Sequence, residues 1–168
     1  MPVMRPLLDR IEAFGNLQPN LIALSEPQRT VTYGALPQTI HDVSRELNAL
    51  GIKRLAIYGD NTIDWALIDL AASTSNITVV PIPLFFSNAQ IQHLCQASHV
   101  DAIFADRPFP IAIGKEISAT TLKGHFIQLS VSSHIPDPMA PTAPAGNKIT
   151  FTSGSTGEPK GACLGTDT

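Results

Sequence analysis

The chain has 168 residues, of which 43% are hydrophobic and 15% charged, and its formal net charge is −3. This length suits a single domain with its own apolar core, and the scattered basic residues lack the stripe that nucleic-acid binding needs. A typical domain has about 25% charged residues. Either the surface is therefore rich in neutral polar side chains, or part of it faces other protein.

Neither the cysteines nor the start of the chain indicates a secreted or membrane-spanning protein. The start of the chain lacks the apolar stretch of a secretory signal, and the longest apolar run, residues 77–86, is too short for a membrane span. Cys95 and Cys163 fit neither a disulfide framework nor a zinc motif, and on a helix His93 and Cys95 would not share a face. We expect a soluble, cytoplasmic protein with reduced thiols, no membrane span and no metal-binding residues.

The first half of the chain changes its hydrophobic period near residue 36. Residues 21–24 and 30–32 resemble two short strands joined by a turn at 26–28. Apolar residues then recur at spacings of three and four, which predicts an amphipathic helix over residues 36–50. Gly51 follows where a left-handed cap is favoured.

An alternation of strands and helices follows. Strands are predicted at 55–58, 77–82 and 102–105, with a helix from residue 63 and another over 87–98. The second helix starts with a capping-box pattern, Ser87 followed by Gln90. Crossovers of this length imply parallel strands. The predicted fold class is α/β, with a mostly parallel sheet flanked by helices. The pattern leaves open whether the two early strands belong to this sheet or lie outside it.

The pattern weakens after residue 106. Residues 107–110 form a predicted turn, and 111–125 fit a poor helix or an irregular loop. A strand is predicted at 126–131. A loop rich in proline and alanine follows at 135–147, and a last strand covers 148–152.

The most informative stretch begins where that last strand ends. Glycines in it permit close approach of backbone to a ligand, successive backbone N–H groups can form an anion-binding nest, and hydroxyl groups can donate to phosphate oxygens. Lys160 adds a positive charge. The candidate phosphate-binding residues are Thr152, Ser153, Gly154, Ser155, Thr156, Gly157, Lys160 and Gly161.

This loop is not a Walker P-loop. That motif needs a glycine five residues after Gly154, where Pro159 stands, and a hydroxyl residue after the lysine, where Gly161 stands. Anion binding would then depend on the nest and side chains and not on a following helix. The alternative is an exposed turn without a ligand.

The order of residues 152–161, Thr-Ser-Gly-Ser-Thr-Gly-Glu-Pro-Lys-Gly, resembles the signature loop of the adenylate-forming superfamily. That superfamily comprises acyl-CoA synthetases, luciferases and the adenylation domains of nonribosomal peptide synthetases. Residues 32–36, 55–61 with Trp65, and 79–83 resemble other segments of the family, so the likeness covers about residues 20–164.

The resemblance implies an ATP-dependent ligase. A carboxylic acid would react with Mg²⁺-bound ATP to give an acyl-adenylate and pyrophosphate, and a thiol, commonly that of coenzyme A, would then take the acyl group. The loop would close over the β- and γ-phosphates. We expect residues 1–168 to be the N-terminal portion of an AMP-binding domain, with a C-terminal domain and all catalytic residues elsewhere in a longer parent, and we favour a fatty or other carboxylic acid as substrate.

Two alternatives concern the chain by itself. It could bind ATP or polyphosphate as a separate module, or it could be a non-functional fragment that self-associates through uncovered apolar surface. The pair Phe85 and Phe86 is a candidate for such surface. Trp65 fits a core or interface aromatic better than a ligand contact, and Cys163 on an apolar strand is typical of a small buried hydrophobe.

Overall fold

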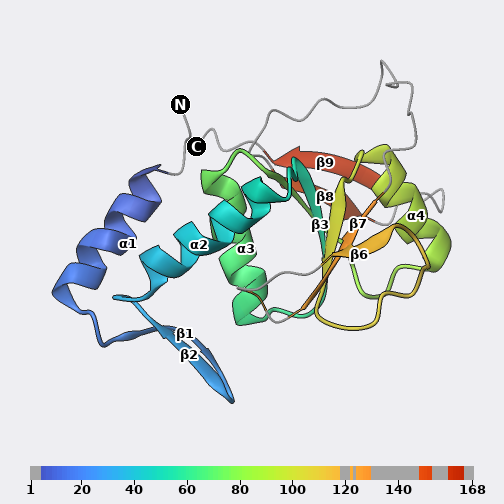
Figure 1. The fold of residues 1–168 in the computed structure, drawn as a ribbon. Helices are drawn as coiled ribbons and strands as arrows, with labels where there is room; N and C mark the ends of the chain where they lie inside the picture. Colours follow the sequence, from blue (N-terminus) through green and yellow to red (C-terminus); the bar gives the residue numbers. More distant parts are fainter. Residues whose placement is uncertain (1–4, 118–121, 123, 130–147, 153–158, 165–168) are drawn as a thin grey trace.

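The computed structural model describes residues 5–117, 122, 124–129, 148–152 and 159–164. Two sheets are present in this part of the chain, a two-stranded one and a seven-stranded one. Helices cover both faces of the larger sheet, with α2 and α3 on one side and α4 on the other (Figure 1).

The N-terminal elements stand beside this sheet. Helix α1 (Arg5–Leu17) was not predicted, although Leu7, Ile11 and Phe14 recur in it at helical spacings; several of its large apolar side chains remain exposed. It packs on the next segment through Phe14, whose ring meets Tyr33 edge-on at 4.6 Å. Strands β1 (Ile22–Glu26) and β2 (Arg29–Thr32) form an antiparallel hairpin outside the main sheet, as predicted.

Helix α2 (Leu36–Ala49) confirms the predicted amphipathic helix. The stripe residues Leu36, Ile40, Val43 and Leu47 are buried. Gly51 has a φ of +71°, the left-handed conformation that the cap position favours.

The seven-stranded sheet has the order β6-β7-β5-β3-β4-β8-β9. Strands β3, β4, β5 and β8 run parallel, and β6, β7 and β9 pair antiparallel, which confirms a mostly parallel α/β sheet. The strands are β3 (Arg54–Tyr58), β4 (Thr78–Pro81), β5 (Ala102–Ala105), β6 (Lys115–Ile117), β7 (His125–Gln128), β8 (Lys148–Thr152) and β9 (Lys160–Leu164).

Two predictions in the second half need correction. Residues 111–125, expected as a poor helix or loop, contain the short edge strand β6, whose Lys115 and Glu116 are exposed and carry no apolar period. The strand predicted at 126–131 begins one residue earlier and ends at Gln128, and residues 130 and 131 lie outside the described part. The predicted loop at 135–147 also lies outside it.

Both crossover helices start at side-chain caps, and the sequence predicted the second of them. In α3 (Ile63–Thr74), the Thr62 hydroxyl accepts a hydrogen bond from the Trp65 amide at 3.1 Å. In α4 (Asn88–Ala97), Ser87 and Gln90 complete a reciprocal capping box.

Alternation along the parallel strands divides the core into two clusters. Leu55 and Ile57 of β3 pack with α2 and α3, while Ala56 between them packs with the α4 side. The same rule places Val79 and Val80 of β4 on opposite faces. Each face of the sheet thus has its own apolar layer.

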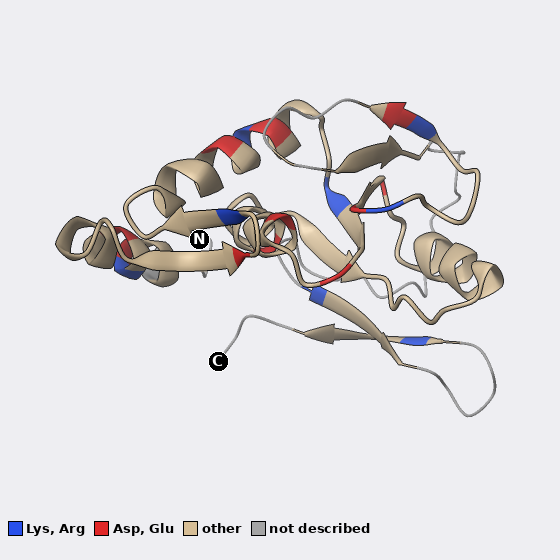
Figure 2. Ribbon diagram, turned by 90° about the horizontal axis from the view of Figure 1, so that it is seen from below, with Lys and Arg blue, Asp and Glu red and all other residues tan. Residues whose placement is uncertain are grey.

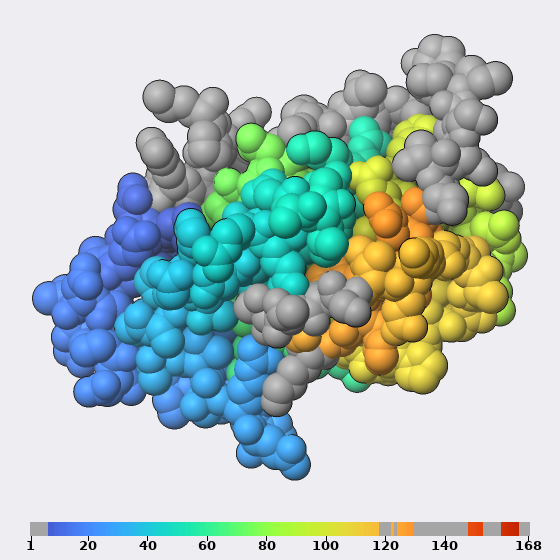
Figure 3. Space-filling model, in the orientation of Figure 1, coloured from blue at the N-terminus to red at the C-terminus, as the bar shows by residue number. Residues whose placement is uncertain are grey.

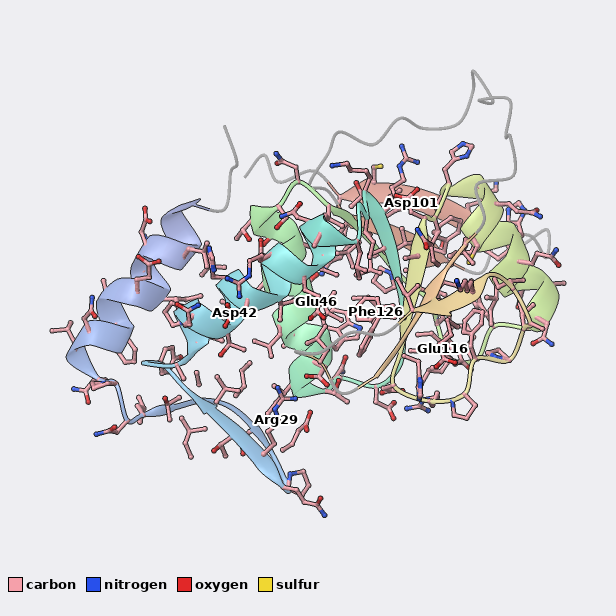
Figure 4. All side chains as sticks on the ribbon, viewed as in Figure 1. Arg29, Asp42, Glu46, Asp101, Glu116 and Phe126 are labelled. Atoms are coloured by element: carbon pink, nitrogen blue, oxygen red, sulfur yellow. The ribbon has the colours of Figure 1, made fainter. Side chains whose placement is uncertain are left out.

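Strand β5 has an aspartate on each side of it. The Asp101 carboxylate, labelled in Figure 4, accepts hydrogen bonds from the Lys53 and Arg54 amides at 2.8 and 2.7 Å, at the start of β3. After β5, the Asp106 carboxylate accepts from the Asp60 amide at 2.9 Å, beyond the end of β3. Aspartate side chains therefore link β3 and β5 at both ends of this strand pair, before the strands begin and after they end.

Two side-chain interpretations were wrong in part. Phe86 is buried against the α4-side cluster, and only Phe85 of the pair is exposed, at 81%. Cys163 is exposed and not buried, because it lies on the edge strand β9, all of whose residues are exposed.

Candidate functional site

The candidate phosphate loop connects two paired strands. Strands β8 and β9 form an antiparallel hairpin in which Thr152 pairs with Lys160, so these two residues flank the loop. The hairpin runs along one border of the molecule, with one basic position at the start of each strand (Figure 2). Ser153, Gly154, Ser155, Thr156 and Gly157 lie outside the described residues, and their assignment stays a prediction.

The register places Thr152 past the end of the neighbouring strand. Lys148 aligns with Val79 of β4, so Thr150 comes level with Pro81, the last residue of β4. Since β8 runs parallel to β4, Thr152 lies beyond the carboxyl end of that strand. Ligands of open α/β sheets bind outside the carboxyl ends of the strands.

Thr152 and Lys160 share one face of the hairpin, because residues directly opposite in an antiparallel pair point the same way. Lys148 belongs to this face by alternation, and its ammonium group contacts α3. Ile149 belongs to the other face and is buried in the α4-side cluster. Thr152 and Lys160 are exposed, so a hydroxyl and an ammonium group stand together at the mouth of the loop.

Packing on the hairpin also favours a glycine at position 161. A Cβ atom at this position would lie 3.0–3.3 Å from three ring atoms of Phe151, which pairs directly with it. The glycine therefore makes room for this ring on the hairpin. Its predicted contact with phosphate stays a prediction.

Lys148 was not assigned a role from the sequence, but the structure gives it two partners. Its Nζ atom lies 2.7 and 2.9 Å from the two carboxylate oxygens of Asp69 and 5.1 Å from the ring centroid of Trp65. Both partners belong to α3, far away in the sequence. No local pattern could have indicated this contact, and Trp65 proves to be a partly buried aromatic under a lysine.

A second polar group lies at the carboxyl edge of β3 and β5. Arg107 donates to Asp106 at 2.7 Å and to Asp60, and these hydrogen bonds, to Asp106 first, raise the pKa of the Arg107 guanidinium. Gly59 is required beside them, because a Cβ there would lie 2.5 Å from the Asp106 carboxylate carbon. The arginine charge is thus already balanced within the chain.

A shallow hollow of about 480 Å³ adjoins Arg107. It is lined mainly by the apolar loop 108–113 and by β6 and β7, which lie on the half of the sheet opposite the β8–β9 hairpin. In the space-filling view these segments, yellow to orange, occupy the side away from α1 (Figure 3). The hollow and the loop are therefore separate features.

The described residues hold neither a helix long and apolar enough to cross a membrane nor a group of three or more metal-ligand side chains. Cys95, weighed with His93 as a metal ligand in the sequence, is buried in the α4-side cluster. Burial raises the pKa of its thiol to about 12.

The fold defines an α/β domain with a mostly parallel sheet, and comparison with known proteins gives the family. A family model described as AMP-binding enzyme matches residues 11–168. The chain therefore belongs to the AMP-binding enzyme family, the adenylate-forming superfamily whose signature loop it resembles.

Sequence relatives agree with this assignment. A polyketide synthase–nonribosomal peptide synthetase of Phaeosphaeria nodorum is 28% identical over 94% of this chain and 4% of its own length. A D-alanine–D-alanyl carrier protein ligase of Lacticaseibacillus rhamnosus is 28% identical over 67% of this chain and 22% of its own. The chain thus spans less than a quarter of either relative.

Solved structures agree on the fold. A fatty acyl CoA synthetase of Mycobacterium tuberculosis superimposes with a TM-score of 0.68 at 17% identity, over 99% of this chain and 36% of that one. The N-terminal subdomain of NpsA from Klebsiella oxytoca gives a TM-score of 0.66 at 19% identity, over 95% of this chain and 42% of that one.

Proposed function

We propose that residues 1–168 form the N-terminal portion of the AMP-binding domain of an acid ligase, and that the β8–β9 hairpin binds the β- and γ-phosphates of ATP. The observation that carries this proposal is the pairing of Thr152 with Lys160 at the mouth of the loop, beyond the carboxyl end of β4. An exposed ammonium group and a hydroxyl group suit a polyphosphate, which needs positive charge and hydrogen-bond donors.

The proposed reaction has two steps. A carboxylate oxygen of the acid attacks the α-phosphorus of ATP, and the bond to the bridging oxygen breaks, which gives acyl-adenylate and pyrophosphate. A thiol then attacks the acyl carbonyl, and AMP leaves. Lys160 and Thr152 contribute to the first step by holding the departing pyrophosphate and balancing its charge. Mg²⁺ bound with the nucleotide would neutralise further phosphate charge.

The acyl acceptor is proposed to be a thiol of coenzyme A or of a carrier protein. The sequence alone favoured coenzyme A and a fatty or other carboxylic acid. The names of the sequence relatives, peptide synthetases and a carrier protein ligase, give the carrier-protein thiol and an amino acid equal standing.

The test is a thermal melt of the 168-residue chain with and without Mg-ATP. A ligand at one hundred times its Kd adds about 2.7 kcal/mol to the folded state, which in a chain of this size raises Tm by about 5–10 °C. Lys160→Ala should reduce this rise by half or more. Lys53→Ala is the matched control, because Lys53 is an exposed lysine next to the opposite, amino edge of β3.

Equal shifts for Lys160→Ala and wild type would refute the assignment of Lys160. Absence of any shift in the wild-type chain would refute nucleotide binding by these residues alone.

A second candidate is a separate ATP- or polyphosphate-binding module, and a pyrophosphate-release assay distinguishes it from the ligase. All catalytic residues are expected outside residues 1–168. We therefore expect the 168-residue chain to bind Mg-ATP without releasing pyrophosphate when carboxylic and amino acids are added. Formation of an acyl-adenylate by this chain would show that it carries the whole first step.

A further inference from the structure

Strand β8 has a weak backbone connection to the rest of the sheet. Four register pairs join β3 to β4, but among the described residues a single pair, Val79 with Lys148, joins β4 to β8. The partner on its other side, β9, is itself an exposed edge strand. Other contacts must therefore fix the position of the β8–β9 hairpin against the body of the domain.

The side chains of β8 provide these contacts on both faces. Ile149 is buried on the α4 side. On the opposite face, Lys148 bridges both carboxylate oxygens of Asp69 and lies over the Trp65 ring. Asp69 and Trp65 stand four residues apart on α3, which places them on one face of that helix. We call Lys148, Asp69 and Trp65 the Lys148 clamp.

Helix α3 is itself well fixed. Leu67 and Ile68 are fully buried, and its first turn is held by the β1–β2 hairpin, because Glu26 accepts a hydrogen bond from the Ile63 amide. The clamp thus ties β8 to a rigid element and not to another surface loop. Its charges are only partly exposed, at 31% for Lys148 and 30% for Asp69, so they are screened less than a surface pair.

We propose that Lys148 is a positioning residue for the phosphate site: the clamp sets the β8–β9 hairpin, and with it Thr152 and Lys160, relative to the carboxyl edge of the sheet. The inference rests on the proposed phosphate-binding function. Lys148 lies four residues before Thr152, about 13 Å along an extended strand, so it acts through the strand and does not touch the phosphates.

The experiment compares four single variants of the chain, and the double variant of Lys148→Met with Asp69→Asn, by hydrogen exchange and by Mg-ATP affinity. Lys148→Met keeps an unbranched side chain of similar length but removes the charge, and with it the ion pair and the cation–π contact. Asp69→Asn removes the other charge, and Lys148→Arg retains the ion pair. The matched control is Lys115→Met on β6, an exposed lysine on the far side of the sheet.

Loss of the clamp should speed amide exchange in residues 149–152 by about 3–10-fold, the factor expected for one partly buried ion pair and one cation–π contact. Exchange in β3 and β5 should stay unchanged. The Kd for Mg-ATP should rise by about the same factor in Lys148→Met and in Asp69→Asn, and the double variant should be no weaker than either. Lys148→Arg should stay within about twofold of wild type.

Three results would overturn the proposal or separate it from the proposed function. Unchanged exchange in residues 149–152 would show that the clamp does not hold β8. Faster exchange with unchanged affinity, while Lys160→Ala still weakens binding, would refute positioning but leave the phosphate site intact. If wild type did not bind Mg-ATP, the proposed function and the positioning role would both fail.

Discussion

Arg29 is predicted to be a major contributor to stability through a single contact. Its guanidinium lies 2.5 Å from the Asp64 carboxylate in the first turn of α3, where Asp64 is 4% exposed and the Arg29 side chain 21%. Figure 4 labels Arg29 on the hairpin beside the lower end of α3. Arg29→Met should therefore leave a buried carboxylate without its main counter-charge.

The expected loss of unfolding free energy is about 3 kcal/mol, the lower end of the range for removing one partner of a buried ion pair, because Arg29 keeps some contact with solvent. In a chain of 168 residues this corresponds to a fall in Tm of about 6–12 °C. Urea unfolding monitored by circular dichroism measures the same quantity independently.

Arg45→Met is the matched control. Arg45 forms a 2.8 Å ion pair with Asp42, but 71% of its side chain is exposed, so the identical change should cost less than about 0.5 kcal/mol. Adding Asp64→Asn to Arg29→Met should recover part of the loss, since it removes the buried negative charge that Arg29 balances. Similar effects of Arg29→Met and Arg45→Met would refute the reasoning that burial decides the contribution of this pair.

Two further predictions use contacts in the α/β core and at the edge strand. Gly124→Ala should destabilise the chain by about 1–3 kcal/mol, because the new Cβ would lie 2.4 Å from a ring atom of Phe104 in a packed core; denaturant unfolding measures this, and a loss below 0.5 kcal/mol would contradict the geometry. With a thiol reagent at pH 8, Cys163 should react and Cys95 should not. Cys163 is exposed, whereas burial raises the pKa of Cys95 to about 12, so its thiol stays protonated until the chain unfolds. Rapid modification of both thiols in the folded chain, shown by mass spectrometry, would disagree with this placement.

The parallel core could be predicted because its signals are local. The capping box at Ser87 and the stripe of α2 each lie within one helix, and both are confirmed. Helix α1 was missed although its signal is also local, since Leu7, Ile11 and Phe14 recur at helical spacings of four and three. Strand β6 was missed because three residues at a sheet edge need no apolar alternation.

In the candidate site, too, some features could be predicted from the sequence and others could not. The residue order of the loop is a local signal, so the sequence alone could indicate phosphate binding by residues 152–161. The partners of Lys148 are a property of the tertiary structure, since Asp69 lies 79 residues away. The exposure of Cys163 likewise depends on β9 being an edge strand, which no pattern within the strand reveals.

The two aspartates around β5 have a consequence for how the central strands find their alignment. A slip of one residue between β3 and β5 would turn core side chains to the wrong face, but a slip of two would preserve the alternation of Leu55, Ala56 and Ile57. Burial of apolar side chains alone therefore discriminates poorly against a register slip of two residues. Asp101 and Asp106 exclude it, because each carboxylate meets its backbone amides at only one alignment. The two carboxylates therefore fix the register of β5 against β3 at both ends of the strand pair.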